Sequence, residues 1–163
     1  MRVVSNTSPL SNLAIIGRVD LLRARYGRVV IPPAVAVELQ ALTHREGRAA
    51  IQAAMNTGWL VTEPLPAESE AGRLRDSLDA GEAEAIALAA ATAADVLLLD
   101  ERRGRVVARE FGLKVAGVLG ELLHAKLNGS VPSMKEEIQR LRADARFFIS
   151  PGIEAFFLKE AGE

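Results

Sequence analysis

The sequence predicts an α/β protein in which a central parallel sheet of about five strands lies between two layers of helices. Short runs of Val, Ile and Leu alternate along the chain with longer helical runs, and the connections between them are short. Residues 96–99 are apolar at every position, which is typical of a central parallel strand buried on both faces. Strands and helices that alternate in this way form a doubly wound sheet covered on both sides.

Composition narrows the class of protein further. The 163 residues fit one domain, and 49% hydrophobic with 25% charged residues are ordinary values for a globular protein. Cys is absent and only 2 His are present, which excludes disulfides, thiolate sites and a zinc cluster. A net charge of −1 gives no global attraction to nucleic acid. We find no signal peptide and no apolar stretch long enough to span a bilayer, so we expect a soluble, cytoplasmic protein.

The first half of the chain predicts three strands that alternate with helices. β-branched residues mark the strands, and turn or capping residues mark the ends of the helices. Ser8 is expected to cap the first helix with Pro9 at its first position, Pro32-Pro33 begins the second, and Gly58 ends the third. The predicted strands are residues 3–5, 29–31 and 59–62, and the predicted helices run from residue 9, over 32–42 and over 47–56.

The second half begins with a polar segment, residues 63–79, which contains two prolines and is expected to be a mobile connection. The helix after it is apolar almost all round, so we expect burial on both sides. Ser133 and Glu136 predict a capping box. Residues from about 131 are expected to form a helical C-terminal extension of a single domain, 1–163. The other predicted elements are strands 96–99 and 114–116 and helices 81–94, 102–111, 119–127, 134–143 and 151–160.

Polar residues follow two of the strands at the carboxyl edge of the predicted sheet, where α/β folds place their active sites. Asn6 directly follows the first strand and Asp100 the fourth; a turn residue and a helix cap are the structural alternatives. Glu38 lies on the core side of its helix, near Val35 and Leu42 on the helical wheel. Because a buried carboxylate is costly, it needs a cation or hydrogen bonds, and an ion pair with an arginine is the alternative.

Glu82 and Glu84 open the helix over 81–94, where the positive end of the helix dipole already favours acids. They are two positions apart, about 200° around the helix, so at most one can face a shared site, and periodicity leaves the choice open. Three carboxylates and an amide at one edge, without His or Cys, suit Mg²⁺ or Mn²⁺. A hydrated ion held in this way can activate water and neutralise phosphate, which is a route to phosphodiester cleavage.

The stretches SNTSPL, IPPAVAVEL, GEAEAIALA and VLLLDERRGR, in this order and spacing, resemble a PIN-domain protein. More narrowly, the chain is similar to the small prokaryotic type related to toxin–antitoxin ribonucleases, from residue 3 to about 150. The resemblance implies a parallel sheet between helices and Mg²⁺- or Mn²⁺-dependent endonucleolytic cleavage of single-stranded RNA. It also implies a small antitoxin protein as partner.

Carried over position by position, the resemblance implies four catalytic and metal-binding residues: Asn6, Glu38, Glu82 and Asp100. Glu84 is the less favoured alternative to Glu82, and Glu101 is a helper. Thr7 and Ser8 match hydroxyl residues that follow the first acid in this family. Asn6 stands where PIN nucleases normally carry Asp, and an amide supplies an oxygen without the charge, so the resemblance implies a weakened enzyme.

Other functions stay open at this point. The main alternative is a PIN-shaped module that binds a protein or RNA without cutting it; a phosphoryl-accepting receiver domain would want an acid pair where only Asn6 stands. Phenylalanines gather at residues 147–157, which suits docking of the last helix or, alternatively, an antitoxin or dimer surface, and we expect a homodimer. Four arginines could meet the RNA backbone or the tail of a protein inhibitor, or form a solvated face paired with Asp and Glu: Arg102, Arg103, Arg105 and Arg109.

Overall fold

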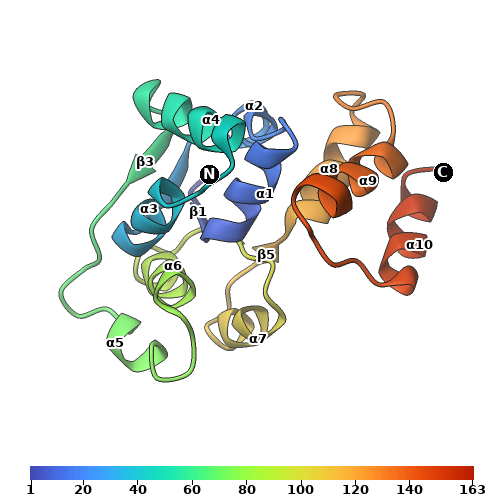
Figure 1. Ribbon diagram of the computed structural model, residues 1–163. Coiled ribbons are helices and arrows are strands. Elements are labelled where there is room, and N and C mark those ends of the chain that lie inside the picture. Colours follow the sequence, from blue (N-terminus) through green and yellow to red (C-terminus); the bar gives the residue numbers. More distant parts are fainter.

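A computed structural model describes residues 1–163 and shows a five-stranded sheet in which all neighbouring strands are parallel (Figure 1). The strand order is β3-β2-β1-β4-β5, so β1 and β4 lie side by side in the middle of the sheet. The predicted number and direction of strands are confirmed. The strands are β1 (Val3–Ser5), β2 (Val29–Ile31), β3 (Leu60–Thr62), β4 (Val96–Leu98) and β5 (Val115–Ala116).

Helices cover both faces of this sheet, which confirms the predicted three-layer α/β/α fold. Successive strand residues point to opposite faces, so Val3 joins the core on one side and Val4 the core on the other. Helices α1, α2, α3, α4, α8 and α9 contribute to the first core, and α5, α6 and α7 to the second. No helix has both the length and the apolar character needed to cross a membrane.

Most helices lie where the sequence predicts them. Pro33 begins α3, and Ser150 caps α10 by accepting a hydrogen bond from the Ile153 amide at 3.3 Å. The helices are α1 (Thr7–Ile15), α2 (Asp20–Tyr26), α3 (Pro33–Gln40), α4 (Arg45–Asn56), α5 (Ala71–Leu74), α6 (Ala80–Ala91), α7 (Arg102–Glu110), α8 (Val118–Leu127), α9 (Met134–Asp144) and α10 (Pro151–Glu160).

Three local predictions need correction. Helix α1 begins at Thr7 with Asn6 at the cap position, so Ser8 is a helical residue and does not cap the helix. The segment 63–79, expected to be a connection, contains the short helix α5. Helix α2 was not predicted. It lies between Gly17 and Gly27, whose φ angles of 73° and 74° allow the chain to turn at both ends.

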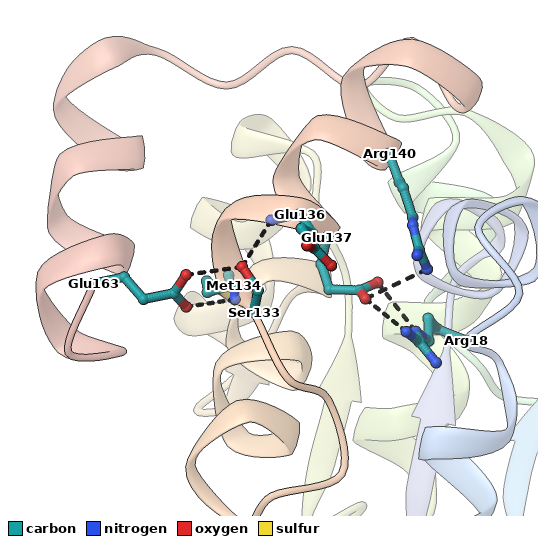
Figure 2. A network of polar contacts seen from close by, with 7 residues as sticks. All are labelled: Arg18, Ser133, Met134, Glu136, Glu137, Arg140 and Glu163. Atoms are coloured by element: carbon teal, nitrogen blue, oxygen red, sulfur yellow. Dashed lines mark hydrogen bonds and ion pairs between the residues drawn. The ribbon is translucent and has the colours of Figure 1, made fainter.

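Two carboxylates hold the C-terminal helices in place: buried Glu137 joins α9 to the rest of the protein, and Glu163 joins the end of the chain to the start of α9 (Figure 2). Glu137 of α9 is fully buried and accepts hydrogen bonds from Arg18 at 3.1 and 2.8 Å. At the start of α9, the Ser133 hydroxyl accepts from the Glu136 amide at 3.2 Å, which is half of the predicted capping box. The Glu136 carboxylate does not bond back to Ser133; instead the Glu163 carboxylate accepts from the Met134 amide at 2.5 Å. Negative charge at this position is favoured by the helix dipole.

Candidate active site

The polar residues at the carboxyl edge of the sheet meet because β1 and β4 are neighbours. Ser5 pairs with Leu98, and the Asn6 amide donates to the Leu98 carbonyl at 2.9 Å. Asn6 begins the connection after β1, and Asp100 and Glu101 lie in the connection after β4. These residues are therefore at the same edge of the sheet. This is the location that open α/β folds use for binding and catalysis.

Glu101 links the connection after β4 to the start of α1. Its carboxylate accepts from the Asn6 side-chain amide at 3.4 Å and from the Ser8 hydroxyl at 2.6 Å. Burial is the main cause that raises the pKa of Glu82 and of Asp100, and the charge of Glu101 adds to it in both cases. The sequence assigned Glu101 only a helper role, whereas the structure places it among three of the four predicted site residues.

Asp100 is a buried carboxyl group that is only half satisfied. One oxygen accepts from the Val118 amide at 2.9 Å, so this side chain caps α8 instead of the α7 helix that follows it in sequence. The other oxygen, Oδ2, and the Oδ1 atom of Asn6 are both buried without a hydrogen-bond partner. Burial raises the pKa of Asp100 to about 6, although the Val118 amide and the Arg105 charge lower it. Buried oxygens without partners are uncommon and suit a site that receives its ligand from solution.

The structure separates Glu82 from Glu84, which periodicity could not do. Both are buried in α6. Glu84 is occupied on both oxygens, by the Ala34 amide at 2.7 Å and by Arg75. Glu82 instead lies near the carboxylates of Asp79 and Glu101; burial first, and then these two neighbours, raise its pKa to about 7. Of the two, Glu82 is the carboxyl group that faces other acids and has no cationic partner.

Glu38 accepts a hydrogen bond from the Thr7 hydroxyl. Glu38 is half-buried and forms no ion pair with an arginine, so that alternative does not apply to this residue. Thr7 adjoins Asn6 at the start of α1, so the bond links Glu38 on α3 to the connection that follows β1.

Two glycines make room for these carboxylates. A Cβ atom at Gly81 would lie 2.6 and 2.7 Å from the two oxygens of Glu38, and one at Gly104 would lie 2.9 Å from an oxygen of Glu82. A Cβ at Gly117 would lie closest to the guanidinium group of Arg105 and only then, at 2.6 Å, to an oxygen of Asp100, so this glycine makes room for an arginine beside the acid. Gly81 and Gly104 lie inside helices, where glycine is unfavourable relative to alanine, so the close approach of a carboxylate is their structural reason. A glycine within a predicted helical run is the sequence signal of such a close approach.

The donor chemistry at this edge, rather than a complete ligand set, is that of a hydrated divalent cation. The donors are oxygen atoms only, two of them are buried without partners, and glycines give room to the carboxylates of Glu38 and Glu82. Such donor sets suit Mg²⁺ and Mn²⁺. No group of three or more His, Cys, Asp or Glu residues is arranged to hold a metal ion by itself.

Comparison with protein families matches residues 2–163 to a family described as a PIN domain. No curated protein matches the chain.

Proposed function

The chain belongs to the PIN-domain family, and this membership suggests a nuclease-type function. We propose that the protein is a metal-dependent endoribonuclease that cleaves single-stranded RNA. PIN domains generally use divalent metals. One observation supports the proposal most strongly: the unpartnered, buried oxygens of Asn6 and Asp100 lie at one edge of the sheet beside Glu101. Neighbouring carboxylates repel one another when no cation is present, so binding of a cation between them is favourable.

In this proposal the ion is Mg²⁺ or Mn²⁺ and its protein ligands come from Asn6, Glu38, Glu82 and Asp100. When bound, such an ion activates water and offsets the charge of the phosphate. The chain's other residues position these ligands. Glu101 holds the Asn6 amide through its Nδ2 atom, which leaves the Oδ1 oxygen free. Thr7 orients the carboxylate of Glu38.

The decisive experiment adds the charge that Asn6 lacks. Two unit charges about 4 Å apart interact by about 4 kcal/mol at an effective dielectric constant near 20, before desolvation is subtracted. Asn6→Asp should therefore tighten Mn²⁺ binding by at least about tenfold, which corresponds to about 1.4 kcal/mol. The variant should also cleave single-stranded RNA faster, and Glu38→Gln should cancel both gains. Isothermal titration with Mn²⁺ and a cleavage assay measure the two effects.

Asn56→Asp is the matched control because Asn56 is exposed at the end of α4, away from the carboxyl edge. It adds the same charge and should leave Mn²⁺ affinity unchanged. If Asn6→Asp brings neither tighter Mn²⁺ binding nor cleavage, the nuclease proposal is wrong.

A binding module without nuclease activity is the second candidate function. Two observations favour it: Asn6 stands in place of an acid, and no group of three or more His, Cys, Asp or Glu residues is arranged to hold a metal ion. In that case the added carboxylate of Asn6→Asp meets no ion and repels Glu101, so the variant should only lose stability.

We also propose that the nuclease is the toxin of a toxin–antitoxin pair, inhibited by a small antitoxin protein, and that it forms a homodimer. Where a short gene lies beside the gene of this chain, co-expression of its product should restore the growth of cells that express the chain. Analytical ultracentrifugation of the purified protein tests the dimer.

A further inference from the structure

A groove opens beside Asp100, between helix α7 and the C-terminal segment. Its volume is about 550 Å³, within the range of sites that hold a small ligand or one nucleotide. One wall is α7, and the other is the 145–150 connection together with α10; this connection joins the red α10 to α9 in Figure 1. The lining residues that matter here are Asp100, Arg102, Arg105, Arg109, Phe147 and Phe148.

The α7 wall is positively charged. Arg102, Arg105 and Arg109 follow helical spacing and share one face of α7, whereas Arg103 lies outside the groove. None of these four arginines forms an ion pair, contrary to the alternative of a face paired with Asp and Glu. Arg105 is held by the Leu99 carbonyl at 2.8 Å and lies near Asp100. Arg102 and Arg109 are exposed and available to an anion.

The opposite wall is aromatic. Phe147 and Phe157 pack against the core, as docking of the last helix predicts. Phe148, however, is 87% exposed and lines the groove. Packing within this chain does not explain so exposed an aromatic ring. Exposed aromatic rings opposite unpaired arginines are the combination with which proteins bind single strands, by stacking on bases and attracting phosphates.

We infer that this groove binds the nucleotides of a single-stranded RNA next to the phosphate that is cleaved. Phe148 stacks on a base, and Arg102 and Arg109 contact backbone phosphates. The inference rests on the proposed function, because Asp100 belongs both to the groove and to the proposed metal site. A duplex does not fit this arrangement, since only an unstacked base can present its face to Phe148.

The test measures RNA binding without cleavage. Fluorescence anisotropy with a fluorescein-labelled single-stranded RNA is recorded in EDTA. Phe148→Ala should weaken binding by about tenfold, the effect of losing one stacked base. Arg109→Ala should weaken binding and reduce the slope of log Kd against log salt by about one.

Matched controls lie close by. Phe156→Ala removes another exposed ring that does not line the groove, and Arg103→Ala removes an α7 arginine outside it. Phe156→Ala should leave RNA affinity unchanged. In the Arg103→Ala background, Phe148→Ala should still weaken RNA binding by about tenfold. Phe148→Trp should retain binding, and RNA should quench the fluorescence of the introduced indole.

Unchanged RNA affinity in Phe148→Ala, or equal competition by duplex RNA, would overturn the inference and leave the groove as a face for protein docking. These outcomes differ from failure of the proposed function. If RNA binds through Phe148 but Mn²⁺ brings no cleavage, the nuclease proposal fails and the groove stands. If RNA is cleaved but Phe148→Ala binds it normally, the groove alone fails.

Discussion

At the scale of single residues, the site depends on which atoms the fold leaves without partners. Asn6 and Asp100 each retain one buried oxygen with no hydrogen bond, whereas both oxygens of Glu84 are occupied. Burying a polar atom without a partner costs free energy. That cost falls on the residues that the PIN resemblance assigns to metal binding, which makes the effects of single substitutions predictable.

Asp100→Asn should not destabilise the protein when metal is absent. The neutral amide can still accept from the Val118 amide through its oxygen, and it removes a buried charge beside Glu101. In EDTA at pH 7.5, the melting temperature should be unchanged or higher than that of the wild type. The stabilisation by Mn²⁺ should disappear. A large loss of stability in EDTA would show that Asp100 is a structural cap of α8 only.

Gly81→Ala should separate metal binding from stability. The new methyl group would displace the carboxylate of Glu38, the flexible end of a side chain, while alanine favours the helix by up to about 1 kcal/mol. We therefore expect unchanged or increased stability and weaker Mn²⁺ binding, measured by chemical denaturation and calorimetry. Gly152→Ala is the control, because it occupies the same second position of α10 with open space around it. Equal Mn²⁺ affinity in the two variants would mean that Glu38 does not hold the ion.

At the scale of elements, α9 is attached to the α/β core through a buried charge. Glu137 is fully buried, and its two flanking arginines are not equivalent. Arg18, from the connection between α1 and α2, donates two hydrogen bonds; Arg140, from α9 itself, approaches only to 3.6 Å (Figure 2). The bond across elements therefore accounts for most of the compensation of the buried carboxylate.

Arg18→Ala should destabilise the protein by about 3 kcal/mol, because it leaves the buried carboxylate of Glu137 with one distant partner. Arg140→Ala should cost less than about 1 kcal/mol, since Arg140 is 46% exposed and its ion pair is long. Urea denaturation of both variants at pH 7 measures the two free energies of unfolding. Equal losses would contradict the assignment of Arg18 as the main partner.

At the scale of the whole molecule, the carboxyl cluster makes stability depend on pH. The folded-state pKa values of Glu82 and Asp100 are about 7 and about 6, against ordinary values of 4.5 and 3.8. Between these limits the folded state binds more protons than the unfolded state, so the free energy of unfolding falls as pH rises. The favourable contribution is complete below the ordinary values and is lost as pH rises through the folded-state values.

In EDTA, the melting temperature should therefore decrease between pH 5 and pH 7.5. Saturating Mn²⁺ should reduce or reverse this decrease, because the cation favours the ionised carboxylates. The double variant Glu82→Gln, Asp100→Asn should flatten the profile over the same range. Scanning calorimetry measures all three. A wild-type melting temperature that rises steadily over this range in EDTA would contradict the raised pKa values.

The sequence by itself determined all five strands, most of the helices and the residue types available as ligands, but not the short helices α2 and α5. Runs of β-branched residues and residues such as Pro33, Ser133 and Ser150 mark strands and helix starts because their effects act within a few positions of the chain. Oxygen ligands without His or Cys likewise follow from composition. The same local information failed for Ser8, whose hydroxyl is bonded to Glu101, 93 positions away.

Tertiary structure decided which of these donors meet. Glu101 reaches Asn6 because β1 and β4 are adjacent in the sheet. The order of strands in a sheet cannot be read from the periodicity of the sequence. Glu82 and Glu84 are equivalent in periodicity and differ only because Arg75 and the Ala34 amide lie beside Glu84. The physical reason is common to both cases. Periodicity records which side of an element is apolar, whereas the partner of a buried polar atom depends on elements brought together from distant parts of the chain.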